Sequence, residues 1–212
     1  MKFLIGIVFL FIAFGVFGQE YPDSGFTNKA EAKNLMVNGL KEGKWCEYVY
    51  DNNLLPTTDS TVARYYYLTV YKAGKYCGIR RVYYKNGVLR DLFPYNTDGV
   101  INGIEKVYRE NGTIWAENPW INGKHTGTYK QYFSDGKLMQ EYYSDNGKQT
   151  GPEKWYYEDG TLESETYYTE GVKNGIKKEY YEDGKLKTEI SFVKGVKGTT
   201  RNFDKNGAEI SQ

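Results

Sequence analysis

The chain has 212 residues and a near-neutral charge, with 28 Lys and Arg against 27 Asp and Glu. This balance is unlike the basic composition of nucleic-acid-binding proteins, and we expect no nucleic-acid partner. Tyrosine occurs 22 times. Because tyrosine can bury its ring while its hydroxyl stays in water, this composition favours a thin, half-exposed sheet over a thick core.

Residues 1–18 have the pattern of a secretory signal peptide. Lys2 supplies the positive start, and an unbroken apolar run follows from Phe3 to Phe17. The run is shorter than the roughly 20 residues that a membrane-spanning helix needs. We therefore expect cleavage before Gln19, no transmembrane helix in the mature chain, and a periplasmic or extracellular location. An uncleaved membrane anchor is the alternative. Residues 19–37 are expected to form an N-terminal cap or linker.

From residue 38 onward, glycine recurs with a period of about 24 residues. A fixed period of this length is typical of a repeat array. We predict seven copies within residues 38–212, starting near residues 38, 73, 98, 122, 146, 170 and 194. Copies two to seven each contain an Asn-Gly or Asp-Gly pair, which predicts a hairpin turn. The structural turn glycines are then Gly87, Gly112, Gly136, Gly160, Gly184 and Gly207.

The residues between these turns predict strands. We number each copy from the glycine nine residues before its turn glycine, so that position 0 is Gly127 and position 9 is Gly136 in the fourth copy. Position 5 is aromatic in all seven copies, and position 3 is basic in six. Aromatic enrichment between Asn/Asp-Gly pairs indicates β-hairpins. The predicted fold is all-β: an elongated, single-sheet antiparallel meander of about seven hairpin repeats.

Two hairpin registers are compatible with this pattern. A two-residue loop at positions 8 and 9 pairs position 3 with position 14, which matches Lys with Glu. These pairs are Lys106–Glu117, Lys130–Glu141, Lys154–Glu165 and Lys178–Glu189. It also pairs position 6 with position 11, as in Tyr84–Leu89, Phe133–Leu138, Tyr157–Leu162 and Tyr181–Leu186. Such cross-strand pairs are favourable, so we favour this register. A three-residue loop with a bulged glycine is the alternative, and it pairs position 5 with position 11.

The segments that lead from one copy to the next are expected to be looser turns.

The units GTYKQYFSDGKL (127–138), GPEKWYYEDGTL (151–162) and GIKKEYYEDGKL (175–186) resemble MORN repeats, and in particular their bacterial variant. The resemblance covers residues 38–212, with a degenerate first copy and a short last one. It implies a β-hairpin repeat fold that supplies an interaction surface. Bacterial members are commonly labelled YwqK-type antitoxins, which implies a neutralising function. The signal peptide departs from that label, because an exported protein does not meet a cytosolic toxin.

The sequence offers no catalytic or metal-binding constellation. The single histidine, His125, excludes a multi-histidine metal site and is expected to be a solvated turn residue. We therefore expect no enzyme activity, no catalytic residues, no metal and no cofactor. An exported chain permits a disulfide between Cys46 and Cys77, but the two lie at non-equivalent positions of adjacent copies. A bridge and two free thiols both remain open.

The candidate binding surface is the position-5 aromatic stripe, with a loop inserted in the first copy as an edge contact. Its residues are Tyr83, Tyr108, Tyr132, Tyr156, Tyr180, Leu54 and Leu55. Rigid aromatic rings are common binding hot spots, although the same rings could simply hold a one-layer sheet together. The expected partner is another protein. A glycan of the cell envelope is the alternative, and a toxin neutralised by this protein is a third possibility.

Overall fold

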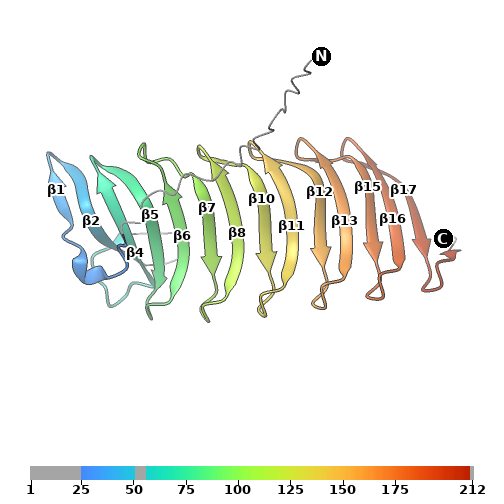
Figure 1. The fold of residues 1–212 in the computed structure, drawn as a ribbon, viewed down its shortest axis with the longest axis horizontal. Helices are drawn as coiled ribbons and strands as arrows, with labels where there is room; N and C mark the ends of the chain where they lie inside the picture. The colour runs from blue at the N-terminus through green and yellow to red at the C-terminus, as the bar shows by residue number, and fades with distance from the viewer. Residues whose placement is uncertain (1–24, 51–55, 211–212) are drawn as a thin grey trace, which may run out of the picture.

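The computed structural model describes residues 25–50 and 56–210. These residues form one open antiparallel sheet of 18 strands, and the only helix among them is the single 3₁₀ turn η1 (Lys29–Glu31). Figure 1 shows the strands side by side in one elongated row, from blue at the N-terminal end to red at the C-terminal end. The predicted single-sheet meander of hairpin repeats is confirmed.

The strands follow one another along the row in the order of the chain. They are β1 (Leu35–Val37), β2 (Leu40–Val49), β3 (Pro56–Thr57), β4 (Tyr65–Lys72), β5 (Lys75–Tyr84), β6 (Leu89–Tyr95), β7 (Gly103–Tyr108), β8 (Ile114–Ile121), β9 (Lys124–His125), β10 (Gly127–Tyr132), β11 (Leu138–Asp145), β12 (Lys148–Tyr156), β13 (Leu162–Thr169), β14 (Val172–Lys173), β15 (Gly175–Tyr180), β16 (Leu186–Val193), β17 (Val196–Phe203) and β18 (Glu209–Ile210). Each long strand pairs antiparallel with the one before and the one after it, as β10 does with β8 and β11.

The Asn/Asp-Gly turns close with three-residue loops, so the favoured register is wrong at the turn. In the fourth copy the N–H of Phe133 donates to the carbonyl of Lys137 at 2.8 Å, and the N–H of Gly136 donates to the carbonyl of Phe133 at 3.1 Å. The six turn glycines have φ between +79° and +92°. This is a type I turn followed by a bulged glycine. In five of the six turns the Asn or Asp at position 8 stabilises it by accepting the position-10 N–H, as Asp135 does from Lys137 at 3.0 Å.

The three-residue loop pairs position 5 with position 11. The pairs predicted between positions 6 and 11 are therefore replaced by Tyr83–Leu89, Tyr132–Leu138, Tyr156–Leu162 and Tyr180–Leu186. A shift in register directly below these pairs leaves position 12, which is Met139 in the fourth copy, without a partner. Because of this bulge, the strands nearer the base of the hairpin pair as the two-residue loop predicts, with position 3 opposite position 14. All four predicted Lys–Glu pairs are confirmed as cross-strand neighbours.

The turns between copies are the tighter ones, contrary to expectation. Five of them, such as Asn146–Gly147 with φ of +49° and +83°, place two consecutive residues in the left-handed region. Two such residues define a two-residue type I′ loop. The copies also fit closely here, since a Cβ on Gly127 at position 0 would lie 2.9 Å from the Pro119 ring of the preceding copy.

Full burial is concentrated in the first two copies. Phe26 and Leu68 are completely buried, and Tyr83 packs with them in one cluster. Residues 25–34, which we call the N-terminal strap, cross one face of the sheet. Arg81 Nη1 donates to the Phe26 carbonyl at 3.3 Å, and the N–H groups of Lys33 and Asn34 donate to the carbonyl of Lys44. The strap supplies the second layer that a one-sheet repeat otherwise lacks.

Candidate binding surface

An alternating row of charges crosses one face of the sheet, which we call the ladder face. Each lysine of the row after Lys106 lies between two glutamates, one in its own hairpin and one in the neighbouring copy, whereas Lys106 lies between Glu117 and Leu92. Lys130, for example, pairs with Glu141 in its own hairpin and with Glu117 on β8. The row consists of Lys106, Glu117, Lys130, Glu141, Lys154, Glu165, Lys178, Glu189 and Arg201. The sequence predicts the pairs within hairpins, and the pairing between copies joins them into one continuous row.

Ion pairs form along this row at ordinary distances. The nitrogen-to-oxygen distance is 3.4 Å for Lys106–Glu117, 4.0 Å for Lys178–Glu189 and 3.0 Å for Arg201–Glu189. All of these side chains keep contact with solvent, so each pair contributes only about 0–1 kcal/mol to stability. The row therefore matters more as a charge pattern on the surface than as a source of stability.

The predicted aromatic stripe lies beside the charge row on the ladder face. The hydroxyls of Tyr132 and Tyr156 donate to Glu117 and Glu141 of the preceding copies, both at 2.9 Å. Burial and then these hydrogen bonds raise the pKa of both tyrosines to about 12. Tyr83 is buried beneath the N-terminal strap. The rings thus connect neighbouring copies.

The remaining members of the stripe, Tyr108 and Tyr180, are half-buried in equivalent places. Leu54 and Leu55 lie outside the described residues. The stripe can still contact a partner through its half-exposed rings, and that role stays a prediction.

A second apolar row on the ladder face escaped the sequence analysis. It lies at positions 1 and 16, on the other side of the charge row, and four of its side chains are exposed. They are Ile104, Tyr143, Tyr167 and Ile176, with exposed fractions of 53%, 44%, 43% and 42%. The sequence does indicate the face of this row. Alternate residues of a strand lie on the same face, so position 1 lies on the same face as positions 3 and 5. The variety of residues at positions 1 and 16 hides this row in the sequence.

The strap covers only one end of the ladder face. Where it lies, the central row contains Cys46, Leu68 and Arg81 in place of alternating Lys and Glu. Phe26 packs against this apolar stretch, with Cys46 at the edge of the same cluster. From β7 to β16, no segment among residues 25–50 and 56–210 lies over the ladder face (Figure 1).

A comparison with protein families matches five consecutive units of the chain to the MORN repeat variant. The matched residues are 76–97, 101–122, 126–146, 149–170 and 173–194, which together make up about half of the chain. The chain belongs to the MORN repeat variant family. Members of this family are generally non-enzymatic repeat modules. A comparison with curated proteins gave no match.

The opposite face of copies one and two carries an aromatic cluster whose rings are already covered. Trp45, Tyr71 and Tyr76 follow one another with ring centroids 6.0 and 5.3 Å apart. The Lys41 ammonium lies 4.7 Å from the Trp45 ring, and the Arg80 guanidinium lies 5.2 Å from the Tyr76 ring. The cations and neighbouring rings occupy the aromatic faces that a ligand would need.

Asp91 is the most unusual charged residue of this opposite face. Its side chain is only 6% exposed, and Arg90 Nη1 lies 3.2 Å from its carboxylate. Burial raises the pKa of Asp91 to about 6, despite the opposing effect of Arg90. A carboxylate in such a place costs stability when it ionises.

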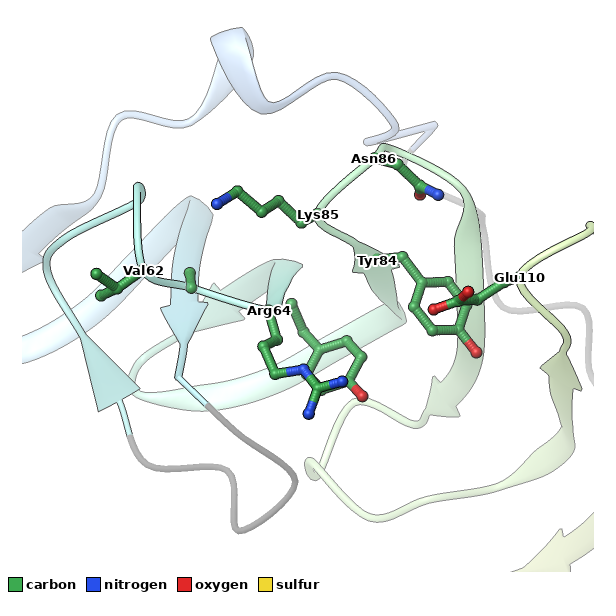
Figure 2. A pocket seen from close by; sticks show the side chains of 8 residues that line it. Val62, Arg64, Tyr84, Lys85, Asn86 and Glu110 are labelled. Atoms are coloured by element: carbon green, nitrogen blue, oxygen red, sulfur yellow. The ribbon is translucent and has the colours of Figure 1, made fainter.

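An open hollow lies between residues 62–64 and the hairpin turn of the second copy (Figure 2). It has a volume of about 300 Å³, and Val62, Arg64, Tyr84, Lys85 and Glu110 are among its lining residues. Figure 2 shows Glu110 beside the Tyr84 ring and Lys85 extending away from both. The Lys85 ammonium donates to the carbonyl of Thr61. The lining contains no Cys, His or Ser, and we find no catalytic arrangement in it.

Other kinds of site are not found in the described part of the chain. Its His, Cys, Asp and Glu side chains form no group of three that could hold a metal. Its helices include none long and apolar enough to cross a membrane. Cys46 and Cys77 are free thiols. His125 is exposed, and its ring contacts Trp120 with centroids 3.5 Å apart.

Proposed function

We propose that this protein is an exported, non-enzymatic MORN repeat protein that binds another protein through the ladder face of copies three to six. The observation that carries the proposal is that the strap covers this face in copies one and two but leaves it open from β7 to β16. The open part combines an exposed apolar row with a regular row of charges. Exposed apolar side chains that line up beside polar ones are typical of a protein interaction site, whereas single scattered ones are not.

The alternative of glycan binding has less support. Sugar recognition needs accessible aromatic faces, and the main aromatic cluster of the protein covers its rings with Lys41 and Arg80. An antitoxin function rests on the family resemblance alone, and no feature of the described residues favours it. Export rests on the pattern of residues 1–18, and a periplasmic or extracellular location is part of the proposal.

The test is capture of partners by the mature chain with a ladder-face variant and a matched control. The tagged chain from residue 19 is exposed to cell-envelope extract. The ladder variant carries Tyr143→Lys and Tyr167→Lys. The control carries Met36→Lys and Val62→Lys, which replace side chains of similar or greater exposure outside copies three to six.

We expect one or more captured proteins to be lost with the ladder variant and kept with the control. Equal capture by both variants would contradict the proposal. Fractionation of cells expressing the full chain tests export separately, and a protein found only in the cytosol would refute that part.

A further inference from the structure

The charge row of the ladder face is self-complementary. Neighbouring strands lie about 4.8 Å apart, so basic and acidic side chains alternate at that spacing along the array. A second copy of the row, turned end for end, can place every lysine opposite a glutamate. This requires a two-fold axis that runs parallel to the strands and passes between two of them. An axis through a strand would place like charges opposite one another.

The extent of the open face fixes where this axis passes. The open ladder face consists of eight long strands, β7, β8, β10, β11, β12, β13, β15 and β16, and its centre lies between β11 and β12. A two-fold axis at this centre pairs Glu141 with Lys154 of the second copy. The other mutual pairs are Lys130 with Glu165, Glu117 with Lys178, and Lys106 with Glu189.

The rows on either side of the charges match under the same operation. In the stripe, every tyrosine meets an aliphatic residue, as Tyr156 meets Leu138. In the exposed row, Tyr143 meets Pro152 and Ile176 meets Pro119. Within the three rows of these eight strands, no charged side chain faces an apolar one. Since interfacial charges select register more than they add affinity, the apolar rows would supply most of the binding free energy.

We propose that two copies of this chain pack face to face through the ladder faces of copies three to six, about a two-fold axis between β11 and β12. The inference rests on the proposed function of this face and names its partner as a second copy. Face-to-face packing of two twisted sheets about 10 Å apart is a common arrangement. The strap lies beyond the eight paired strands: it covers β4 and β5, and the axis places only the two-residue strand β18 of the second copy opposite β5.

The available area is sufficient for a stable dimer. Eight strands span about 38 Å, and five residues along a strand span about 17 Å. The flat area is then about 650 Å² per copy, or about 1,300 Å² in total, which falls within the range of specific interfaces. Isologous contacts of this kind are the commonest in homo-oligomers.

The experiment is sedimentation velocity on the mature chain with complementary charge reversals. We expect the wild-type chain to be dimeric at tens of micromolar. Lys154→Glu alone places two acidic side chains opposite each other at the axis, and Glu141→Lys alone places two basic ones there. Each variant should raise the dissociation constant at least tenfold. An equimolar mixture of the two should restore the dimer, because positions 154 and 141 then carry opposite charges across the axis in both of their contacts.

Lys177→Glu is the control, since it makes the same change of charge on the opposite face and should leave the dimer intact. Circular dichroism of each variant checks that it is folded. The inference is overturned if the wild-type chain is monomeric at 100 µM, if either reversal leaves the dimer unchanged, or if the mixture stays monomeric. A monomeric wild type that still captures a partner through the ladder face would leave the proposed function standing. A confirmed dimer without any captured partner would refute only the binding of a different protein.

Discussion

Replacing the buried Asp91 with asparagine should stabilise the protein at neutral pH. Burial raises the pKa of this carboxyl from the ordinary 3.8 to about 6 in the folded state. Below pH 3.8 the carboxyl is protonated in both states and carries no penalty. Between pH 3.8 and about 6 it ionises first in the unfolded state, so stability falls as the pH rises. Above about pH 6 the whole penalty is present.

The size of the penalty follows from the two pKa values. A rise from 3.8 to about 6 corresponds to about 3 kcal/mol, which is an upper bound for the gain from Asp91→Asn at pH 7.5. For a chain of this length, such a gain raises the melting temperature by about 6–12 °C. At pH 3.5 the variant and the wild type should melt together, because asparagine and the protonated carboxyl have nearly the same shape.

Thermal melting followed by circular dichroism at pH 3.5 and pH 7.5 checks this expectation. The other carboxyl groups are the same in the variant and the wild type, so their titration does not change the difference between the two melting temperatures. Asp145→Asn, at an exposed position of β11, is the control and should change little at either pH. An Asp91→Asn variant that melts at or below the wild-type temperature at pH 7.5 would refute the reasoning.

The repeat, the sheet and the Lys–Glu pairs within hairpins were predictable from the sequence, because each depends on a pattern repeated in several copies. The turn register was not. An Asp-Gly pair such as Asp135–Gly136 is compatible with two-residue and three-residue loops alike. The outcome depends on the hydrogen bond from Lys137 N–H to the Asp135 side chain and on a bulge at Met139. Neither has a signature in the sequence, since the two registers differ only between the turn and the bulge.

The extent of the candidate surface was also beyond the sequence. Tyr83 and Tyr132 occupy the same position of their copies, yet Tyr83 is buried by the strap and Tyr132 is half-exposed. The difference comes from Phe26, which lies before the repeats and shares none of their periodicity. In a one-layer array, what covers each face decides which residues are available for binding, and segments outside the period contribute that cover.

The remaining predictions concern the turns and the contacts between copies, and melting temperature measures each. Gly160→Val should cost about 1–3 kcal/mol from backbone strain alone, because φ is +92° and no atom lies within 4 Å of the added Cβ. That exceeds the cost of Lys154→Ala, so equal losses would count against the bulged turn. Lys194→Asn should stabilise by about 1 kcal/mol, because Lys194 has φ of +47° and asparagine tolerates the left-handed region; an unchanged or lower melting temperature would contradict this. Phe133→Tyr should add about 0.5–1.5 kcal/mol. The equivalent Tyr157 donates from its hydroxyl to the position-5 carbonyl of the next copy at 2.7 Å, and Phe133 occupies the same place without a hydroxyl. Tyr157→Phe is the matched reverse change and should cost a similar amount. If Tyr157→Phe lowers the melting temperature but Phe133→Tyr does not raise it, the hydrogen bond of the position-6 hydroxyl does not stabilise every pair of copies alike.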